Sequence, residues 1–329
     1  MGGPETVLAL DTETTTDPCQ RLLFGVYRFG TWQADGTLQC LEEGLFYDDE
    51  LSMLRPAEFA LLCGYVEAHR GASAGEGPLQ LMSRRAFVND RLWKAVEQGS
   101  LIAGFNLPFD LSRLAVDTRK PKPTMFAGGF TQPLFEWQDR HGVYRPNGYR
   151  PWFRYKPIDR NRALMGWTGY RGPTGPAIHR PEGLGPLLDL KALTFALTGQ
   201  GHSLDGAARR FGLPIAKQGV EEHGTITPRY VGYGRQDVAV TWHLLEALRA
   251  EWDRHPITVS PNRALSPTAM AKGYLRAMGV APPVSKTSEV TAIDLGPWMN
   301  GYYGGRTEVR IRRVPVPVVY LDFLSMYPP

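Results

Sequence analysis

Apolar and polar positions alternate along the first part of the chain in the short periods that strands and helices produce. The run Val7–Leu10 predicts a buried strand that ends in polar residues. Residues 22–30 and the segments around Asp35-Gly36 predict neighbouring antiparallel strands joined by an Asp-Gly turn. Residues 56–69 and 90–99 predict helices, and residues 101–106 predict another buried strand with a helix after it.

The pattern changes at residues 118–183, which are rich in Gly, Pro, Arg and aromatic residues and predict loops and hairpins. Ser203 predicts the N-cap of a helix. Thr227-Pro228 predicts the start of a long helix that runs to about His255. A further capped helix at 266–279 and strands at 306–313 and 317–322 follow. We therefore expect an α/β fold with a mixed sheet.

Composition places the chain among ordinary globular proteins. Its 329 residues suffice for one large or two smaller domains, with 43% hydrophobic and 21% charged residues. No apolar run has membrane-spanning length, and the first residues lack a signal-peptide layout. The three cysteines, Cys19, Cys40 and Cys63, have no CxxC spacing, which is typical of a reducing compartment. We expect a cytoplasmic protein without a membrane partner.

Positive charge is concentrated in one segment. The formal net charge of the chain is +4, but residues 119–180 alone carry +9, which leaves the remainder at −5. Within residues 133–167, arginines alternate with aromatic residues, a composition suited to single-stranded nucleic acid. The candidates for such contacts are Arg145, Arg150, Trp152 and Arg154. A hairpin with its aromatic rings packed inward and its arginines solvated explains the pattern equally well.

Carboxylates follow several of the predicted elements. Asp11 and Glu13 lie two residues apart at the end of the first strand, so both face the same side. Asp110 follows the strand at 101–106. Asp237 lies on the long helix, one turn after Tyr233.

Four carboxylates brought together would repel one another unless divalent cations neutralised them. Oxygen ligands favour Mg²⁺ or Mn²⁺. Two such ions can activate a water and stabilise the leaving oxygen of a phosphodiester, and a neighbouring tyrosine can orient that water.

The order of these motifs resembles the DEDD proofreading exonucleases of the RNase H-like fold, in their tyrosine version. The histidine version needs His where this chain has Gly232. The resemblance covers most of residues 5–250. It implies an RNase H-like mixed sheet with flanking helices and a hairpin-rich insertion at 118–183. It also implies that Asp11, Glu13, Asp110 and Asp237 hold two Mg²⁺ or Mn²⁺ ions and that Tyr233 positions the attacking water.

Two further motifs resemble family B DNA polymerases. The sequence DFLSMYP at 322–328 is similar to the Asp-x-x-Ser-Leu-Tyr-Pro palm motif, with Met326 in place of Leu, and YYGGR at 302–306 is similar to Tyr-x-Gly-Gly. The resemblance implies that Asp322 is a palm metal ligand and that Tyr327 packs under the incoming deoxynucleotide. It implies nucleic-acid contacts for Tyr302, Gly304 and Gly305.

Other details resemble the protein-primed branch of that family. The sequence DTETTT at 11–16 implies that Thr14 contacts single-stranded DNA, and NLPFD at 106–110 implies the same for Asn106 and Phe109. Lys217 matches the lysine that lies near the scissile phosphate. Asp189, His202 and His243 complete no ligand set and are expected to be structural.

These motifs together predict a 3′→5′ exonuclease domain over residues 1–255, then a linker and the truncated start of a polymerase palm over 256–329. The expected partners are single-stranded 3′ ends and primer–template DNA, with deoxynucleotides as substrates of a complete polymerase. Because the chain stops within the first palm motif, primer extension is not expected. The alternatives are a free-standing exonuclease acting on DNA or RNA and a nucleic-acid-binding module without metal.

Overall fold

The structure is a computed structural model that describes residues 4–120, 128–171, 178–179, 181–214 and 223–281, with 291, 293–294, 311 and 314–319. The chain divides into two compact units, Met1–Ala277 and Met278–Pro329. The first unit thus extends beyond the expected boundary at residue 255. In the second unit, residues 314–319 form no strand, which contradicts the described part of the strand predicted at 317–322.

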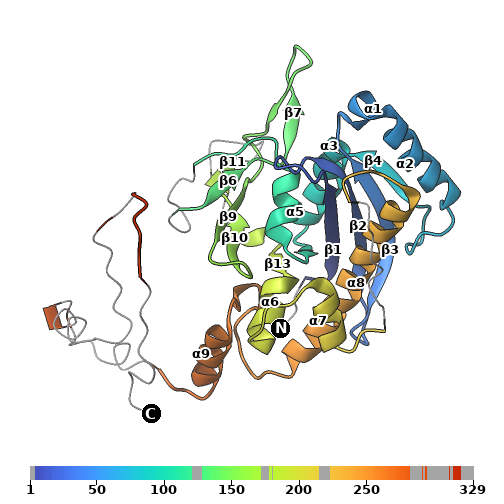
Figure 1. Ribbon diagram of the computed structural model, residues 1–329. Helices are drawn as coiled ribbons and strands as arrows, with labels where there is room; N and C mark the ends of the chain where they lie inside the picture. Colours follow the sequence, from blue (N-terminus) through green and yellow to red (C-terminus); the bar gives the residue numbers. More distant parts are fainter. Residues whose placement is uncertain are drawn as a thin grey trace. The chain divides into compact units, whose positions relative to one another are not determined.

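A six-stranded mixed sheet forms the centre of the first unit (Figure 1). Its strand order is β13-β5-β1-β2-β3-β4. Neighbours β1–β2 and β2–β3 are antiparallel, whereas β1–β5, β5–β13 and β3–β4 are parallel, which confirms the predicted mixed α/β sheet. The strands are β1 Thr6–Thr14, β2 Leu22–Trp32, β3 Leu38–Tyr47, β4 Gln80–Ser83, β5 Leu101–Gly104 and β13 Leu187–Asp189.

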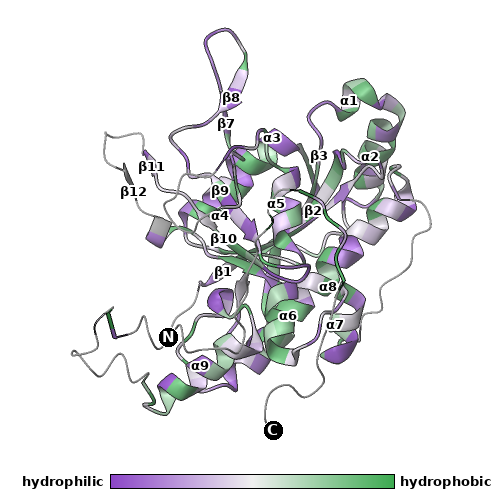
Figure 2. Cartoon of the chain, turned by 60° about the vertical axis from the view of Figure 1, so that its left-hand side comes forward, coloured by the Kyte–Doolittle hydropathy of each residue, from purple (hydrophilic) through white to green (hydrophobic). Residues whose placement is uncertain are grey.

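Helices cover both faces of this sheet, so β1 is apolar at consecutive positions and not only at alternate ones. Leu8 and Leu10 pack with residues of η1, α4 and α5, whereas Val7 and Ala9 pack with α6, α7 and α8. Figure 2 shows hydrophobic residues concentrated on α6 and the central strands. The helical segments are α1 Leu51–Leu54, α2 Pro56–Ala68, α3 Arg84–Ala86, the π-helical η1 Phe87–Leu92, α4 Trp93–Glu97, α5 Leu107–Arg113, η2 Pro181–Gly183, α6 Leu190–Thr198, α7 Leu204–Arg210, α8 Pro228–Asp253, η3 Pro261–Arg263 and α9 Pro267–Ala277.

The long helix α8 begins where the sequence predicts. The side chain of Thr227 accepts a hydrogen bond from the backbone of Tyr230, and Ser203 caps α7 in the same way. Gly234 brings α8 close to the sheet, because a β-carbon at this position would lie 3.1 Å from Phe24 and 3.6 Å from the side chain of Glu13. This close approach sets the distance between α8 and the end of β1.

The predicted hairpin-rich insertion is present. It contains a three-stranded sheet in the order β10-β9-β6 and a hairpin of β7 and β8 that projects from the first unit (Figure 1). Buried aromatic rings of Phe135, Phe153 and Trp167 join the insertion to the core. The strands are β6 Phe130–Gln132, β7 Glu136–Gln138, β8 Tyr144–Pro146, β9 Phe153–Pro157, β10 Ala163–Trp167, β11 Tyr170–Arg171 and β12 Ile178–His179.

The segment after α8 folds back onto the first unit. Ala264 and Met270 are buried in the same hydrophobic cluster as Trp252 of α8. A β-carbon at Gly273 would lie 3.2 Å from Ile257, so α9 packs closely on the chain that leads to it. This packing explains why the unit ends at Ala277. Among the described helices, none is both long and apolar enough to cross a lipid bilayer.

Candidate metal centre

The alternation of β1 separates its polar end into two faces. Odd positions face α8, as Val7 and Ala9 do, and even positions face α5, as Leu8 and Leu10 do. Asp11 and Glu13 therefore extend the α8 face. Carboxylate oxygens of Asp11, Glu13 and Asp237 lie within 4.8 Å of one another. The structure thus unites three of the four predicted metal ligands.

These three side chains fit a divalent cation. Glu13 and Asp237 are buried and Asp11 is half-buried, so their mutual repulsion is poorly screened by water. Each residue offers a hard oxygen donor, which is the ligand type that Mg²⁺ and Mn²⁺ prefer. The group can therefore hold a metal ion.

Asp110 reaches β1 from the opposite face of the sheet. Its Oδ1 accepts hydrogen bonds from the backbone N (3.2 Å) and the hydroxyl (2.8 Å) of Thr12, the residue between Asp11 and Glu13. Asp110 does not belong to the group of three, but it lies near enough to Glu13 for the charge of that residue to raise its pKa. Its other oxygen, Oδ2, is buried and has no hydrogen-bond partner among the described residues.

Burial raises the pKa of Asp110 well above its ordinary value, and the charges of Asp189 and Glu13 raise it further. The hydrogen bonds from Thr12 act in the opposite direction. A buried carboxylate with one unbonded oxygen is costly unless a cation or proton neutralises it. Asp110 therefore also fits a role next to a cation.

Two tyrosines of α8 lie beside the three carboxylates. Tyr230 donates a hydrogen bond of 2.5 Å to Oε2 of Glu13. The ring of Tyr233 stacks on that of Tyr230 at 6.1 Å, and the ring of His223 meets both edge-on. Tyr233, which the sequence predicts to orient water, is half-buried and one helical turn before Asp237.

The turn between β5 and α5 is held by Asp189. Asn106 is in the left-handed conformation, with φ 76° and ψ 39°, and its backbone N donates to Oδ1 of Asp189 at 2.8 Å. The same oxygen accepts from the backbone of Lys191 and caps α6. Asp189 is therefore structural, as expected, and it fixes the loop that leads to Asp110.

Asp189→Asn should stabilise the metal-free protein at pH 7 by about 1–2 kcal/mol. Burial raises the pKa of Asp189 from 3.8 to about 6. A carboxyl with a raised pKa binds its proton more tightly in the folded state, so stability falls as pH rises from about 4 to 6. Asn keeps the oxygen acceptor and is neutral throughout. Urea unfolding should show the gain at pH 7 and almost none at pH 4, whereas a gain that is equal at both pH values would contradict this cause.

The predicted strand-binding residues near the site are accessible to different degrees. Asn106 is exposed, and Thr14 and Phe109 are half-buried. The guanidinium of Arg113 lies 4.9 Å from the centre of the Phe109 ring. Contact with DNA stays a prediction for all three. Six predicted site residues lie outside the described part of the chain: Lys217, Tyr302, Gly304, Gly305, Asp322 and Tyr327.

The insertion presents only some of its predicted contacts to solvent. Arg145 is exposed and forms an ion pair with Asp139. Arg154 is only 1% exposed, which argues against its predicted contact with a strand. Arg150 is half-buried, donates to Asn89 and lies over the rings of Trp93 and Phe135. For β9, the interpretation as a hairpin with inward-packed side chains is thus better than the interpretation as a surface that binds single-stranded DNA.

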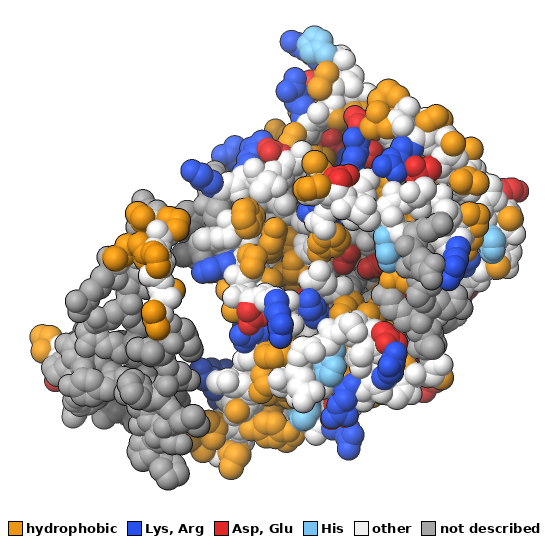
Figure 3. Space-filling model, viewed as in Figure 1, with side chains coloured by type: hydrophobic (Ala, Val, Ile, Leu, Met, Phe, Trp, Pro, Cys, Tyr) orange, Lys and Arg blue, Asp and Glu red, His pale blue; other side chains and the backbone are white. Residues whose placement is uncertain are grey.

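Trp152 is half-buried and donates its indole N–H to the backbone of Asn147. Arg119 stacks on its ring at 4.8 Å. By contrast, the tip of the β7–β8 hairpin carries exposed basic side chains together with His141 (Figure 3). Arg140 and Arg145 of this hairpin are therefore among the described residues of the insertion that present positive charge to solvent.

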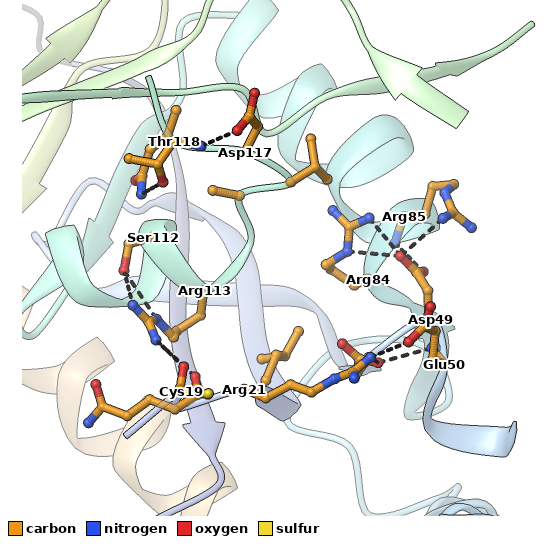
Figure 4. A pocket seen from close by; sticks show the side chains of 16 residues that line it. Cys19, Arg21, Asp49, Glu50, Arg84, Arg85, Ser112, Arg113, Asp117 and Thr118 are labelled. Atoms are coloured by element: carbon orange, nitrogen blue, oxygen red, sulfur yellow. Dashed lines mark hydrogen bonds and ion pairs between the residues drawn. The ribbon is translucent and has the colours of Figure 1, made fainter. Parts of the chain in front are cut away.

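A pocket of about 600 Å³ lies beside the end of α5 and contains none of the predicted site residues (Figure 4). Four arginines line it, and each of them already has a protein partner. Arg21 bonds to Asp48 and Glu50, Arg84 and Arg85 to Asp49 and Glu136, and Arg113 to the backbone of Cys19 and Gln20. The pocket therefore differs from the carboxylate group in both position and chemistry.

Sequence reasoning missed Tyr230 and Thr12, which contact candidate ligands directly. Thr12 carried a signal, since it lies between two predicted ligands and must face the opposite side of the strand. Tyr230 is three residues before Tyr233 and hence on nearly the same helical face.

Neither a scan of protein-family models nor a search of curated proteins found a match to this chain.

Proposed function

We propose that the chain is a nuclease dependent on Mg²⁺ or Mn²⁺ that removes nucleotides from single-stranded 3′ ends of DNA. The observation that carries this proposal is the group formed by Asp11, Glu13 and Asp237, with Tyr233 one turn from Asp237 on α8. The mixed sheet supports the RNase H-like fold that the motifs imply, because an antiparallel N-terminal meander continues in parallel into β5 and β13.

The residues of the site have separate tasks in this proposal. Asp11, Glu13 and Asp237 would hold a cation, and Asp110, whose buried Oδ2 has no hydrogen-bond partner among the described residues, would be a ligand of a second. Bound divalent cations would supply an activated water and stabilise the leaving oxygen of the phosphodiester. Thr12 holds Asp110 in place through its hydroxyl and backbone N–H. The hydroxyl of Tyr233 orients the water for attack.

The wider proposal is that this nuclease is the proofreading part of a family B DNA polymerase. It is supported by the sequence motifs at 302–306 and 322–328, which lie outside the described residues. The exposed hairpin of the basic insertion supports a DNA partner, because arginines there can follow a phosphate backbone.

A labelled-oligonucleotide digestion tests the function. We expect a single-stranded DNA labelled at its 5′ end to yield a ladder of successively shorter products in Mg²⁺ or Mn²⁺ and none in EDTA. The same oligonucleotide with a blocked 3′ end should resist, which distinguishes 3′→5′ removal from internal cleavage. An RNA of the same sequence tests the DNA preference. Failure to digest any of these substrates in either metal would overturn the proposal.

Neutralising exposed arginines of the insertion should weaken DNA binding in a salt-dependent way. In Ca²⁺, the triple variant Arg140→Ala, Arg145→Ala and Arg160→Ala should reduce the slope of log affinity against log salt by up to about 2, at about 0.7 for each lost phosphate contact. Fluorescence anisotropy over a salt series measures this slope. Arg154→Ala is the buried counterpart and should lower the melting temperature and leave the slope unchanged. An unchanged slope in the triple variant would favour solvated arginines without a strand.

A further inference from the structure

The hydroxyl of Tyr230 makes direct contact with a candidate metal ligand. It donates to Oε2 of Glu13 at 2.5 Å, and both side chains are buried. A tyrosine hydroxyl keeps its proton at neutral pH, and a carboxylate oxygen can only accept, so Tyr230 is the donor in this bond. Because the hydroxyl of Tyr230 engages one Glu13 oxygen, it constrains the orientation of the carboxylate.

Tyr230 is itself held from several directions. Its backbone N donates to the N-cap hydroxyl of Thr227. The ring meets Phe24 edge-on at 5.4 Å, stacks on Tyr233 at 6.1 Å and meets His223 edge-on at 5.5 Å. These contacts place the hydroxyl before any cation binds, so the bond to Glu13 costs little ordering at that moment.

We propose that Tyr230 is a positioning residue of the metal centre, which holds the carboxylate of Glu13 in the orientation that binds the cation. Its task differs from that of Tyr233, which acts on the attacking water. The part of this inference that concerns hydrolysis rests on the proposed function, whereas the part that concerns metal affinity does not. Partners of ligating side chains typically change metal affinity by about 10–100-fold when removed.

A second tyrosine–glutamate pair provides a matched control. Tyr27 is fully buried and donates to Oε1 of Glu42 at 2.5 Å, and burial raises its pKa as well. Glu42 does not belong to the three-carboxylate group. Tyr27→Phe therefore removes the same kind of hydrogen bond without touching a candidate ligand. Any effect that is only the loss of a tyrosine–carboxylate hydrogen bond should appear in both variants.

Mn²⁺ titration by calorimetry and Mn²⁺-dependent digestion distinguish the positioning of a metal ligand from the mere loss of a hydrogen bond. Tyr230→Phe should raise the Kd for Mn²⁺ by about 10–100-fold. Its digestion rate should recover to within about threefold of wild type at saturating Mn²⁺, as expected for an affinity defect. Tyr27→Phe should leave the Kd unchanged. Tyr233→Phe should leave the Kd within about twofold but lower the rate at saturating Mn²⁺, because it holds no metal.

A double-mutant cycle with Glu13 separates positioning from a general loss of stability. In the Glu13→Gln background, Tyr230→Phe should change the Kd for Mn²⁺ no further, since the hydroxyl acts through the carboxylate. Metal-free melting curves report folding for each variant. A Kd in Tyr230→Phe within twofold of wild type, or a change equal to that in Tyr27→Phe, would overturn the positioning role. A wild-type protein that binds Mn²⁺ and digests nothing would overturn the proposed function, while the affinities would still decide the role of Tyr230.

Discussion

Asp237→Asn should lower the rate of 3′-end digestion at least about a hundredfold, while the fold and DNA binding in Ca²⁺ persist. Asn has the shape of Asp but lacks its charge, so the three-carboxylate group loses a ligand for the cation. Each tenfold loss of rate corresponds to about 1.4 kcal/mol of barrier, and the electrostatic contribution of a bound metal amounts to several kcal/mol. Single-turnover digestion of a 5′-labelled oligonucleotide measures the effect.

Asp253→Asn is a suitable control, because Asp253 lies on the same helix and its side chain is 68% exposed. It should digest at the wild-type rate. Without metal, Asp237→Asn should melt at a higher temperature than wild type, because it relieves repulsion among carboxylates within 4.8 Å of one another. A digestion rate within threefold of wild type would rule out Asp237 as a metal ligand.

Ending the chain after residue 255 should destabilise the first unit by about 3 kcal/mol or more, a large part of the 5–15 kcal/mol that a domain usually has. The cut removes Ala264 and Met270 from the hydrophobic cluster that also contains Trp252. Burying a side chain such as Met270 is alone worth about 1.5–3 kcal/mol. Urea denaturation followed by tryptophan fluorescence measures the loss.

A chain that ends after residue 281 retains α9 and provides the comparison. Its unfolding midpoint should match that of the full chain, because the compact unit ends at Ala277. It should also digest 3′ ends at the full-chain rate. Equal stability of the two shortened chains would show that α9 adds nothing to the core.

Much of the fold could be predicted because its signals are local. The Asp-Gly turn, the caps at Ser203 and Thr227 and the apolar run in β1 each depend on a few neighbouring residues, and the structure contains all of them. The boundary of the first unit could not be predicted in this way. The apolar positions of α9 show that it packs on another element, but only the tertiary structure shows that this is α6, with His255 beyond the end of α8 bonded to Tyr274.

The candidate site likewise has a part that local sequence predicts and a part that depends on the tertiary structure. Spacing alone placed Asp11 with Glu13 and Tyr233 with Asp237. It could not show that α5 packs on the face of β1 opposite to α8, which is why Asp110 meets Thr12 and lies outside the group of three. Arg154 illustrates the same limit in the insertion, because alternation does not reveal which side of a hairpin meets the core.

The alternation of odd and even positions in β1 also restricts which insertions and deletions this strand can accept. β1 pairs with β2 on one edge and with β5 on the other, so neither neighbour allows it to shift alone. Gaining or losing one residue between Val7 and Asp11 would turn Asp11 and Glu13 toward α5 and Thr12 toward α8, which would dismantle both halves of the site at once. The surface hairpin of β7 and β8 has no such constraint. Relatives of this chain should therefore vary freely in the length of that hairpin while keeping this part of β1 free of gaps.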